Sequence, residues 1–205
     1  TTGTRNIAIG NGALDAPDTE NDNLAIGYDA LGAAIAGGEF NVAIGNYSLD
    51  ANTSGDENVA VGYGSLGANT TGKGNTAIGS EGLKVNTTGD YNTASGSWAL
   101  HSNTTGDGST AIGSEALKAN TTGSSNTATG IFSLNANTTG DKNTATGYSL
   151  YANTTGSNNV GMGYDALAAN TTGTRNISIG NGALDAPDTE NDNLAIGYDL
   201  SLINI

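Results

Sequence analysis

One five-residue phrase recurs along the whole chain and limits what it can fold into. Asn75-Thr76-Ala77-Ile78-Gly79 has counterparts that end in Gly10, Gly27, Gly45, Gly62, Gly79, Gly96, Gly113, Gly130, Gly147, Gly163, Gly180 and Gly197. The step between these glycines is 17 residues, except for one step of 18 after Gly27 and one of 16 after Gly147. A short fixed period is typical of stacked repeats, so we expect a solenoid without a single central core.

The alternation of residue types within each repeat predicts short strands. The phrase places its second and fourth residues on one side of a strand and its middle residue on the other. That middle residue is alanine throughout, apart from Gly161 and Ser178. Leucine recurs in a second segment from Leu14 to Leu200, which we interpret as a second strand. The sequence therefore predicts an all-β fold, a parallel β-solenoid of about twelve 17-residue coils with a seam of alanine and leucine between two sheets.

Two kinds of corner join the predicted strands. The glycine that closes the phrase needs a positive φ or a close approach of another backbone segment. Asn-Thr-Thr-Gly makes the opposite corner, because Asn and Gly tolerate left-handed backbone and Asn can bond to nearby backbone groups. These corners begin at Asn69, Asn86, Asn103, Asn120, Asn137, Asn153 and Asn170, with Asn52-Thr53-Ser54-Gly55 as a variant. They also match the N-glycosylation pattern, but we interpret the asparagines as structural.

A longer repeat lies behind the short one. The segment 4–29 returns as 174–199 with one change, from Ala8 to Ser178. We treat residues 1–200 as a single repeat array and 201–205 as an end segment of unknown role. Thr1-Thr2-Gly3 is the tail of an Asn-Thr-Thr-Gly corner, so we expect a piece of a longer fibre.

Composition argues against several classes of function. A net charge of −14 disfavours nucleic acid and anionic membranes as partners. No apolar run approaches the ~18 residues of a membrane-spanning helix, so we expect no membrane insertion by this segment. The chain has one histidine, His101, and no cysteine, which leaves no usual general-base constellation. The segment 62–67 matches a dinucleotide fingerprint but lacks the helix that it requires. We therefore expect no enzyme, no catalytic residue and no organic cofactor.

Two acidic loops are the weak candidates for a metal site. Their side chains could supply oxygen ligands to calcium: Asp15, Asp18, Glu20, Asp22, Asp185, Asp188, Glu190 and Asp192. No EF-hand or calcium β-roll spacing is present, so solvated acidic loops are the favoured interpretation and no metal is expected.

The repeat resembles a known family of surface fibres. Asn41-Val42-Ala43-Ile44-Gly45 and Asn58-Val59-Ala60-Val61-Gly62 are similar to the head repeats of YadA-like trimeric autotransporter adhesins. With Ala-Leu and Asn-Thr-Thr-Gly added, the repeat also looks like those of bacteriophage tail fibres. The adhesin repeat is shorter, and this chain shows no coiled-coil stalk or membrane anchor. The resemblance covers nearly the whole chain and implies a left-handed β-roll in a homotrimeric rod, extracellular, at a cell surface or on a virion. Besides further copies of the chain, we expect a host-surface receptor or a glycan as partner.

We therefore expect a structural or adhesive fibre segment that holds or forms a receptor-binding surface. One thin coil buries little apolar area, and Ile/Val pairs such as Val42/Ile44 could bury a second face against other chains. The least regular loops, 15–22 and 33–40, are the expected contact surface. The alternative is an ice-binding solenoid, based on the threonine column Thr76, Thr93, Thr110, Thr127 and Thr144 and on two further columns of corner threonines.

Overall fold

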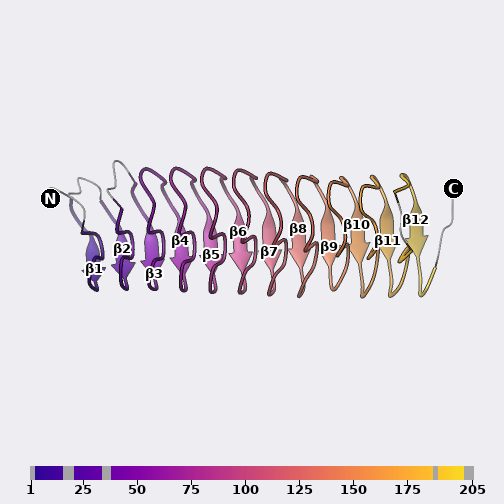
Figure 1. The fold of residues 1–205 in the computed structure, drawn as a ribbon, viewed down its shortest axis with the longest axis horizontal. Coiled ribbons are helices and arrows are strands. Elements are labelled where there is room, and N and C mark those ends of the chain that lie inside the picture. The colour runs from indigo at the N-terminus through magenta and orange to yellow at the C-terminus, as the bar shows by residue number, and fades with distance from the viewer. Residues whose placement is uncertain (1–2, 16–20, 34–37, 187–188, 201–205) are drawn as a thin grey trace.

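The computed structural model describes residues 3–15, 21–33, 38–186 and 189–200. Within these ranges the chain forms one elongated stack of coils, with the first and last strands at opposite ends (Figure 1). The predicted end segment 201–205 lies outside the described residues, as do parts of the loops 15–22 and 33–40.

Each coil contributes one three-residue strand. The strands are β1 (Ile7–Ile9), β2 (Leu24–Ile26), β3 (Val42–Ile44), β4 (Val59–Val61), β5 (Thr76–Ile78), β6 (Thr93–Ser95), β7 (Thr110–Ile112), β8 (Thr127–Thr129), β9 (Thr144–Thr146), β10 (Val160–Met162), β11 (Ile177–Ile179) and β12 (Leu194–Ile196). They form one 12-stranded sheet in chain order. Every pairing is parallel and in step, as in the partnership of Ala60 with Ala77. The predicted all-β parallel solenoid is confirmed, and no helix occurs in the described part of the chain.

The predicted alternation within each strand is also confirmed. The middle alanines of β2 to β9 are fully buried, whereas the residues on either side of them are partly or largely exposed. Behind the sheet, leucines such as Leu66 and Leu117 are fully buried against the alanines. The core is therefore a thin seam of alanine and leucine that runs the length of the stack.

The predicted second strand is wrong. The leucine of each coil lies in the left-handed region, with φ of 52° at Leu117 and similar values at ten others: Leu14, Leu31, Leu49, Leu66, Leu83, Leu100, Leu134, Leu150, Leu167 and Leu184. A left-handed residue cannot continue an extended strand. Coils still bond to one another here, since Leu117 N–H donates to Ser133 O at 3.0 Å. One sheet thus packs on a layer of stacked turns.

The leucine series also ends one coil earlier than the sequence indicates. Leu14 N–H donates to Ala30 O, and in the equivalent bond Leu184 N–H donates to Leu200 O. Leu200 therefore occupies the position of Ala30, the residue before the leucine of a regular coil.

Two columns of buried asparagines hold the coils together. At the Asn-Thr-Thr-Gly corners, each side-chain amide donates to the asparagine of the preceding coil and to its own corner glycine, as Asn120 does to Asn103 Oδ1 and Gly123 O, both at 2.8 Å. In the second column, which has Ser109 in place of asparagine before β7, the asparagine before a strand accepts from the backbone N–H of its counterpart in the next coil, as Asn58 Oδ1 does from Asn75 N–H at 2.9 Å. The predicted structural role of the asparagines is confirmed, and the corner asparagines are too buried to carry a glycan.

The glycine that ends each strand has both properties expected of it. Gly113 has φ of +130°, and a Cβ there would lie 2.5 Å from Gly130 O in the next coil. The glycines of the Asn-Thr-Thr-Gly corners differ, because Gly123 and its equivalents do not have positive φ. There the asparagine side chain closes the corner, so the expected left-handed backbone is not used.

Candidate functional site

Two long surfaces of the solenoid are formed by side chains that lie outside its core. The sheet face is formed by the first and third residues of each strand, which point away from the core. The turn face is formed by the two residues after each strand-ending glycine and by the residue after each leucine. Side chains that differ from coil to coil lie on these faces and at the two residues after each Asn-Thr-Thr-Gly corner, whereas the buried positions repeat.

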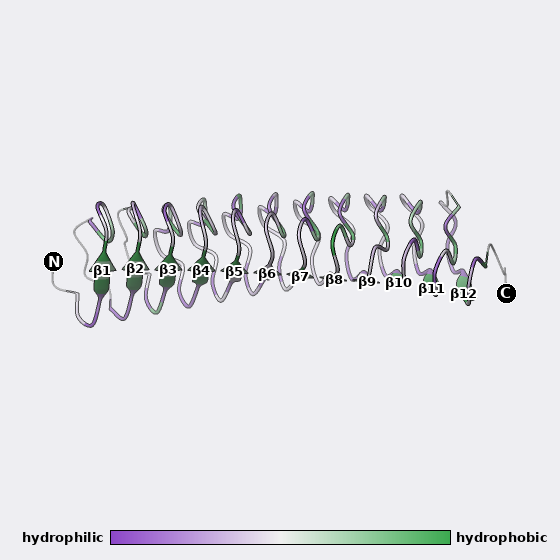
Figure 2. Cartoon of the chain, turned by 90° about the horizontal axis from the view of Figure 1, so that it is seen from below, coloured by the Kyte–Doolittle hydropathy of each residue, from purple (hydrophilic) through white to green (hydrophobic). Residues whose placement is uncertain are grey.

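The sheet face is rich in exposed aliphatic side chains. Ile112 is 46% exposed, and Ile7, Ile9, Ile78, Met162, Ile177, Ile179 and Ile196 are exposed to a similar degree. Figure 2 shows the N-terminal strands as a continuous row of hydrophobic elements. Monomeric proteins rarely expose a contiguous apolar patch of more than a few hundred Å². This face is therefore a candidate interface.

The three threonine columns expected from the sequence are present in the structure, and each lies in a different environment. The strand threonines from Thr76 to Thr144 are neighbours in register on the sheet face. In the corner column that begins at Thr53 and Thr70, each hydroxyl donates to the next coil, as Thr104 Oγ1 does to Thr121 O at 3.0 Å. The second corner column is exposed and uninterrupted over seven coils: Thr71, Thr88, Thr105, Thr122, Thr139, Thr155 and Thr172.

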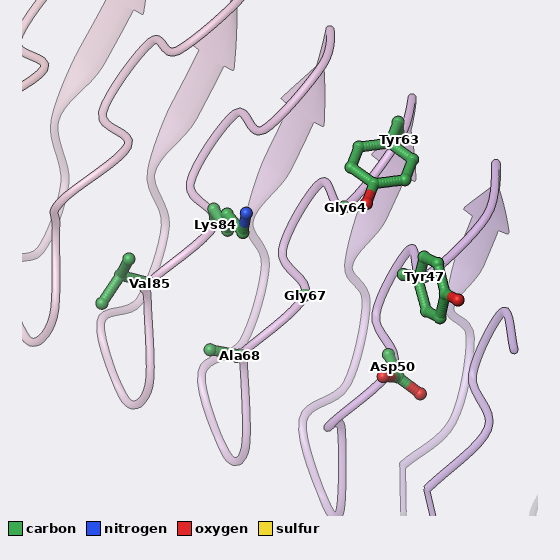
Figure 3. Close-up of a pocket in the computed structure, with 8 residues that line it drawn as sticks. All are labelled: Tyr47, Asp50, Tyr63, Gly64, Gly67, Ala68, Lys84 and Val85. Atoms are coloured by element: carbon green, nitrogen blue, oxygen red, sulfur yellow. The ribbon is translucent and has the colours of Figure 1, made fainter.

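The turn face contains a groove of about 470 Å³ near its N-terminal third. Figure 3 shows the lining side chains spread over three successive coils. They are Tyr47, Asp50, Tyr63, Gly64, Gly67, Ala68, Lys84 and Val85. The groove arises because the middle coil has glycine at two positions where its neighbours carry side chains. Gly64 stands between Tyr47 and Glu81 in one column, and Gly67 stands between Asp50 and Lys84 in another.

The groove walls carry charges of both signs. Lys84 Nζ lies 2.6 Å from Glu81 Oε1. On the other side, the Asp50 carboxylate makes no hydrogen bond or ion pair to another described residue. Partial burial, helped by the charge of Asp29, raises the pKa of Asp50 above its usual range. The groove thus offers an unsatisfied acceptor opposite an ammonium donor.

Further along the turn face, the single histidine is part of a stacked cluster. The rings of His101 and Trp98 stack with centroids 4.6 Å apart, and Lys118 Nζ lies 4.8 Å from the centre of the Trp98 ring. His101 Nε2 is 3.5 Å from Glu81 Oε2. Burial lowers the pKa of His101, although Glu81 opposes this shift. The geometry is that of a packed surface cluster.

A second aromatic cluster marks the 16-residue coil. Tyr148 stacks on Tyr151 and on Tyr164, with ring centroids 5.1 and 5.5 Å apart. Phe132 lies edge-on to Tyr148 and Tyr151. Tyr148 is thus stacked between two rings, while Tyr164 at one end of the stack is 59% exposed.

The acidic loops do not form a metal site in the described part of the chain. Asp22 and Asp192 each pair with an arginine, Arg5 at 2.5 Å and Arg175 at 2.6 Å. These hydrogen bonds lower the pKa of both carboxyl groups. Asp15, Asp185 and Glu190 are exposed, and Asp18, Glu20 and Asp188 lie outside the described residues. Among the residues that the structure describes, no group of three or more acidic, His or Cys side chains is placed to share a metal ion.

Sequence reasoning placed the contact surface in the loops 15–22 and 33–40 and missed the groove. The available signal was the pair Gly64 and Gly67, which departs from both neighbouring repeats.

The described ranges hold no helix long and apolar enough to span a bilayer. No protein-family model matches the chain, and no curated protein or solved structure is significantly similar to it.

Proposed function

We propose that the chain is a non-enzymatic fibre segment, extracellular, at a cell surface or on a virion, in which parallel copies associate into a homotrimeric rod. The rod holds or forms a receptor-binding surface. The observation that carries this proposal is the sheet face, an aliphatic strip on a solenoid whose own core is already closed.

A second copy of the chain fits this strip better than an unrelated partner does. The aliphatic side chains of this face lie in β1–β5, β7 and β10–β12, whereas β6, β8 and β9 carry threonine and serine there. A parallel copy has the same spacing and brings like side chains together at each level. Burying Ile78 and Ile112 would also strengthen a coil whose internal core is only leucine and alanine. The resemblance of the repeat to trimeric adhesins is our reason for proposing three chains.

Sedimentation equilibrium at micromolar concentration tests the assembly. We expect three times the 20.3 kDa chain mass for the wild type and monomers for the double variant Ile78→Asp/Ile112→Asp. The matched control is Ile131→Asp, which makes the same change at a residue 60% exposed on the turn face. A wild-type protein that sediments as a clean monomer would contradict the proposal.

Ice binding is the second candidate, favoured by the exposed corner column from Thr71 to Thr172 and by the threonines of the sheet face. Regular hydroxyl and methyl groups on a flat solenoid surface are its structural requirement. Ice-recrystallisation inhibition by the wild type that is lost in Thr105→Lys/Thr122→Lys would establish it. Absence of inhibition in the wild type would exclude it and leave the fibre proposal untouched.

A further inference from the structure

The groove over Gly64 and Gly67 has the size and lining of a ligand site. Its volume of about 470 Å³ falls within the range of about 300–1,000 Å³ that is common for small-molecule sites. Its floor is glycine backbone with the apolar side chains of Ala68 and Val85. Nothing in the solenoid requires glycine at position 64, since Tyr47 and Glu81 hold the same left-handed conformation on either side, with φ of 60° and 57°.

The charges of the groove select against ionic ligands. A cation attracted to Asp50 would meet the ammonium of Lys84, and an anion attracted to Lys84 would meet the carboxylate of Asp50. A neutral ligand with several hydroxyl groups avoids both conflicts. One hydroxyl can donate to Asp50, and another can accept from Lys84 while Glu81 keeps its ion pair.

The aromatic side chains supply the apolar part of the contact. The rings of Tyr47 and Tyr63 are nearly perpendicular, at 85° with centroids 5.9 Å apart. The Tyr63 ring and its hydroxyl group lie beside Gly64 in the groove (Figure 3), whereas Tyr47 also packs edge-on against Tyr28, with ring centroids 5.4 Å apart. A pyranose ring, with C–H groups on one side and hydroxyl groups around its edge, matches this combination.

We propose that this groove binds one ring of a neutral carbohydrate, with Asp50 and Lys84 bonding to hydroxyl groups and a tyrosine ring covering the C–H face. The inference deepens the proposed function, because it locates a receptor-binding site on the fibre and assigns its ligand class. It does not depend on how many chains form the rod.

Saturation-transfer NMR with glucose, galactose, mannose and N-acetylglucosamine as separate probes tests the proposal. The blocking variant is Gly64→Glu, which places in the groove the side chain that the next coil already carries at Glu81. The matched control is Gly108→Glu, also at a positive φ (+63°) but with nothing within 4 Å of its added Cβ. Circular dichroism and sedimentation are the checks that both variants keep the wild-type fold and assembly.

We expect at least one of these sugars to give a transfer signal with the wild type and with Gly108→Glu, and none to do so with Gly64→Glu. Asp50→Asn should weaken the same signal without altering assembly. Three results would overturn the proposal: no signal from any of the sugars, equal signals from the two glycine variants, or a signal only from the zwitterion alanine. A monomeric wild type that still gives a sugar signal would instead argue against the proposed rod and leave the carbohydrate site standing.

Discussion

Asn126 donates its backbone N–H to Ser109 Oγ at 3.2 Å, where the column of buried asparagines before the strands is interrupted. One level earlier, Asn92 bonds both ways: its Oδ1 accepts from Ser109 N–H at 2.9 Å, and its Nδ2 donates to Gly106 O at 2.8 Å. The Ser109 hydroxyl reproduces the side-chain acceptor, but it is too short to donate to the corner glycine carbonyl as asparagine Nδ2 does. The serine coil therefore lacks one buried hydrogen bond that its neighbours make.

Ser109→Asn should stabilise the protein by about 0.5–1.5 kcal/mol, because it adds one buried hydrogen bond to Gly123 O in a site shaped for asparagine. The reverse change, Asn126→Ser, removes the donor to Gly140 O and should destabilise by a similar amount. Urea denaturation at one fixed protein concentration measures both. Shifts of the same sign would contradict the bonding role of this column.

The strand-ending glycines should be far less tolerant than other left-handed glycines. Gly113→Ala forces a Cβ against Gly130 O and should cost about 3 kcal/mol or more. Gly108→Ala, at φ of +63° in open space, should cost about 1 kcal/mol, since its equivalents Tyr91 and Ser125 adopt the same backbone. Equal costs, measured by thermal denaturation, would mean that close coil contact does not select glycine.

The leucine column should tolerate no charge. Leu117 is fully buried, so Leu117→Asp should cost several kcal/mol and open the stack locally. The side chain of the next residue, Lys118, makes a partly buried ion pair with Glu115 and a contact with Trp98, so Lys118→Ala should cost about 1 kcal/mol, far less than the leucine change. Hydrogen exchange of the neighbouring coils reports the local opening. Equal losses of amide protection in Leu117→Asp and Lys118→Ala would contradict the assignment of Leu117 to the core and Lys118 to the surface.

The sequence predicted the stacking, the register and the inward alanines because each depends on a period. A residue that returns every 17 positions must occupy equivalent places, whatever the path of the chain between them. The conformation of the leucine segment could not be read in the same way. Alternation of Leu117 and Ala119 matches a strand, and left-handed leucine is disfavoured by sterics. Eleven leucines adopt this conformation all the same, and ten of them are buried in the core.

The groove escaped prediction for a related reason. It is defined by side chains that are absent, Gly64 and Gly67, rather than by a motif that is present. Recognising it required knowing that residues 17 positions apart are neighbours and that these two columns lie on one exposed face. The aligned repeats contain the first fact, whereas the second requires the three-dimensional path of the chain between Gly64 and Gly67.

His101 should titrate below the usual histidine pKa of about 6.5. Burial disfavours its charged form, and this effect, helped by the charges of Lys84 and Lys118, outweighs the attraction of Glu81. The Trp98 ring, stacked on the imidazole, contributes to this burial. Because the folded protein then prefers the neutral ring, the contribution of His101 to stability is fully present above the unfolded pKa and declines as the pH falls toward the folded pKa. As the only histidine, it gives a single imidazole signal in an NMR titration.

Trp98→Ala should move the pKa of His101 back toward the usual value, whereas Trp98→Phe should keep most of the shift. A wild-type pKa above about 6.5 would mean that the ion pair with Glu81 dominates over burial.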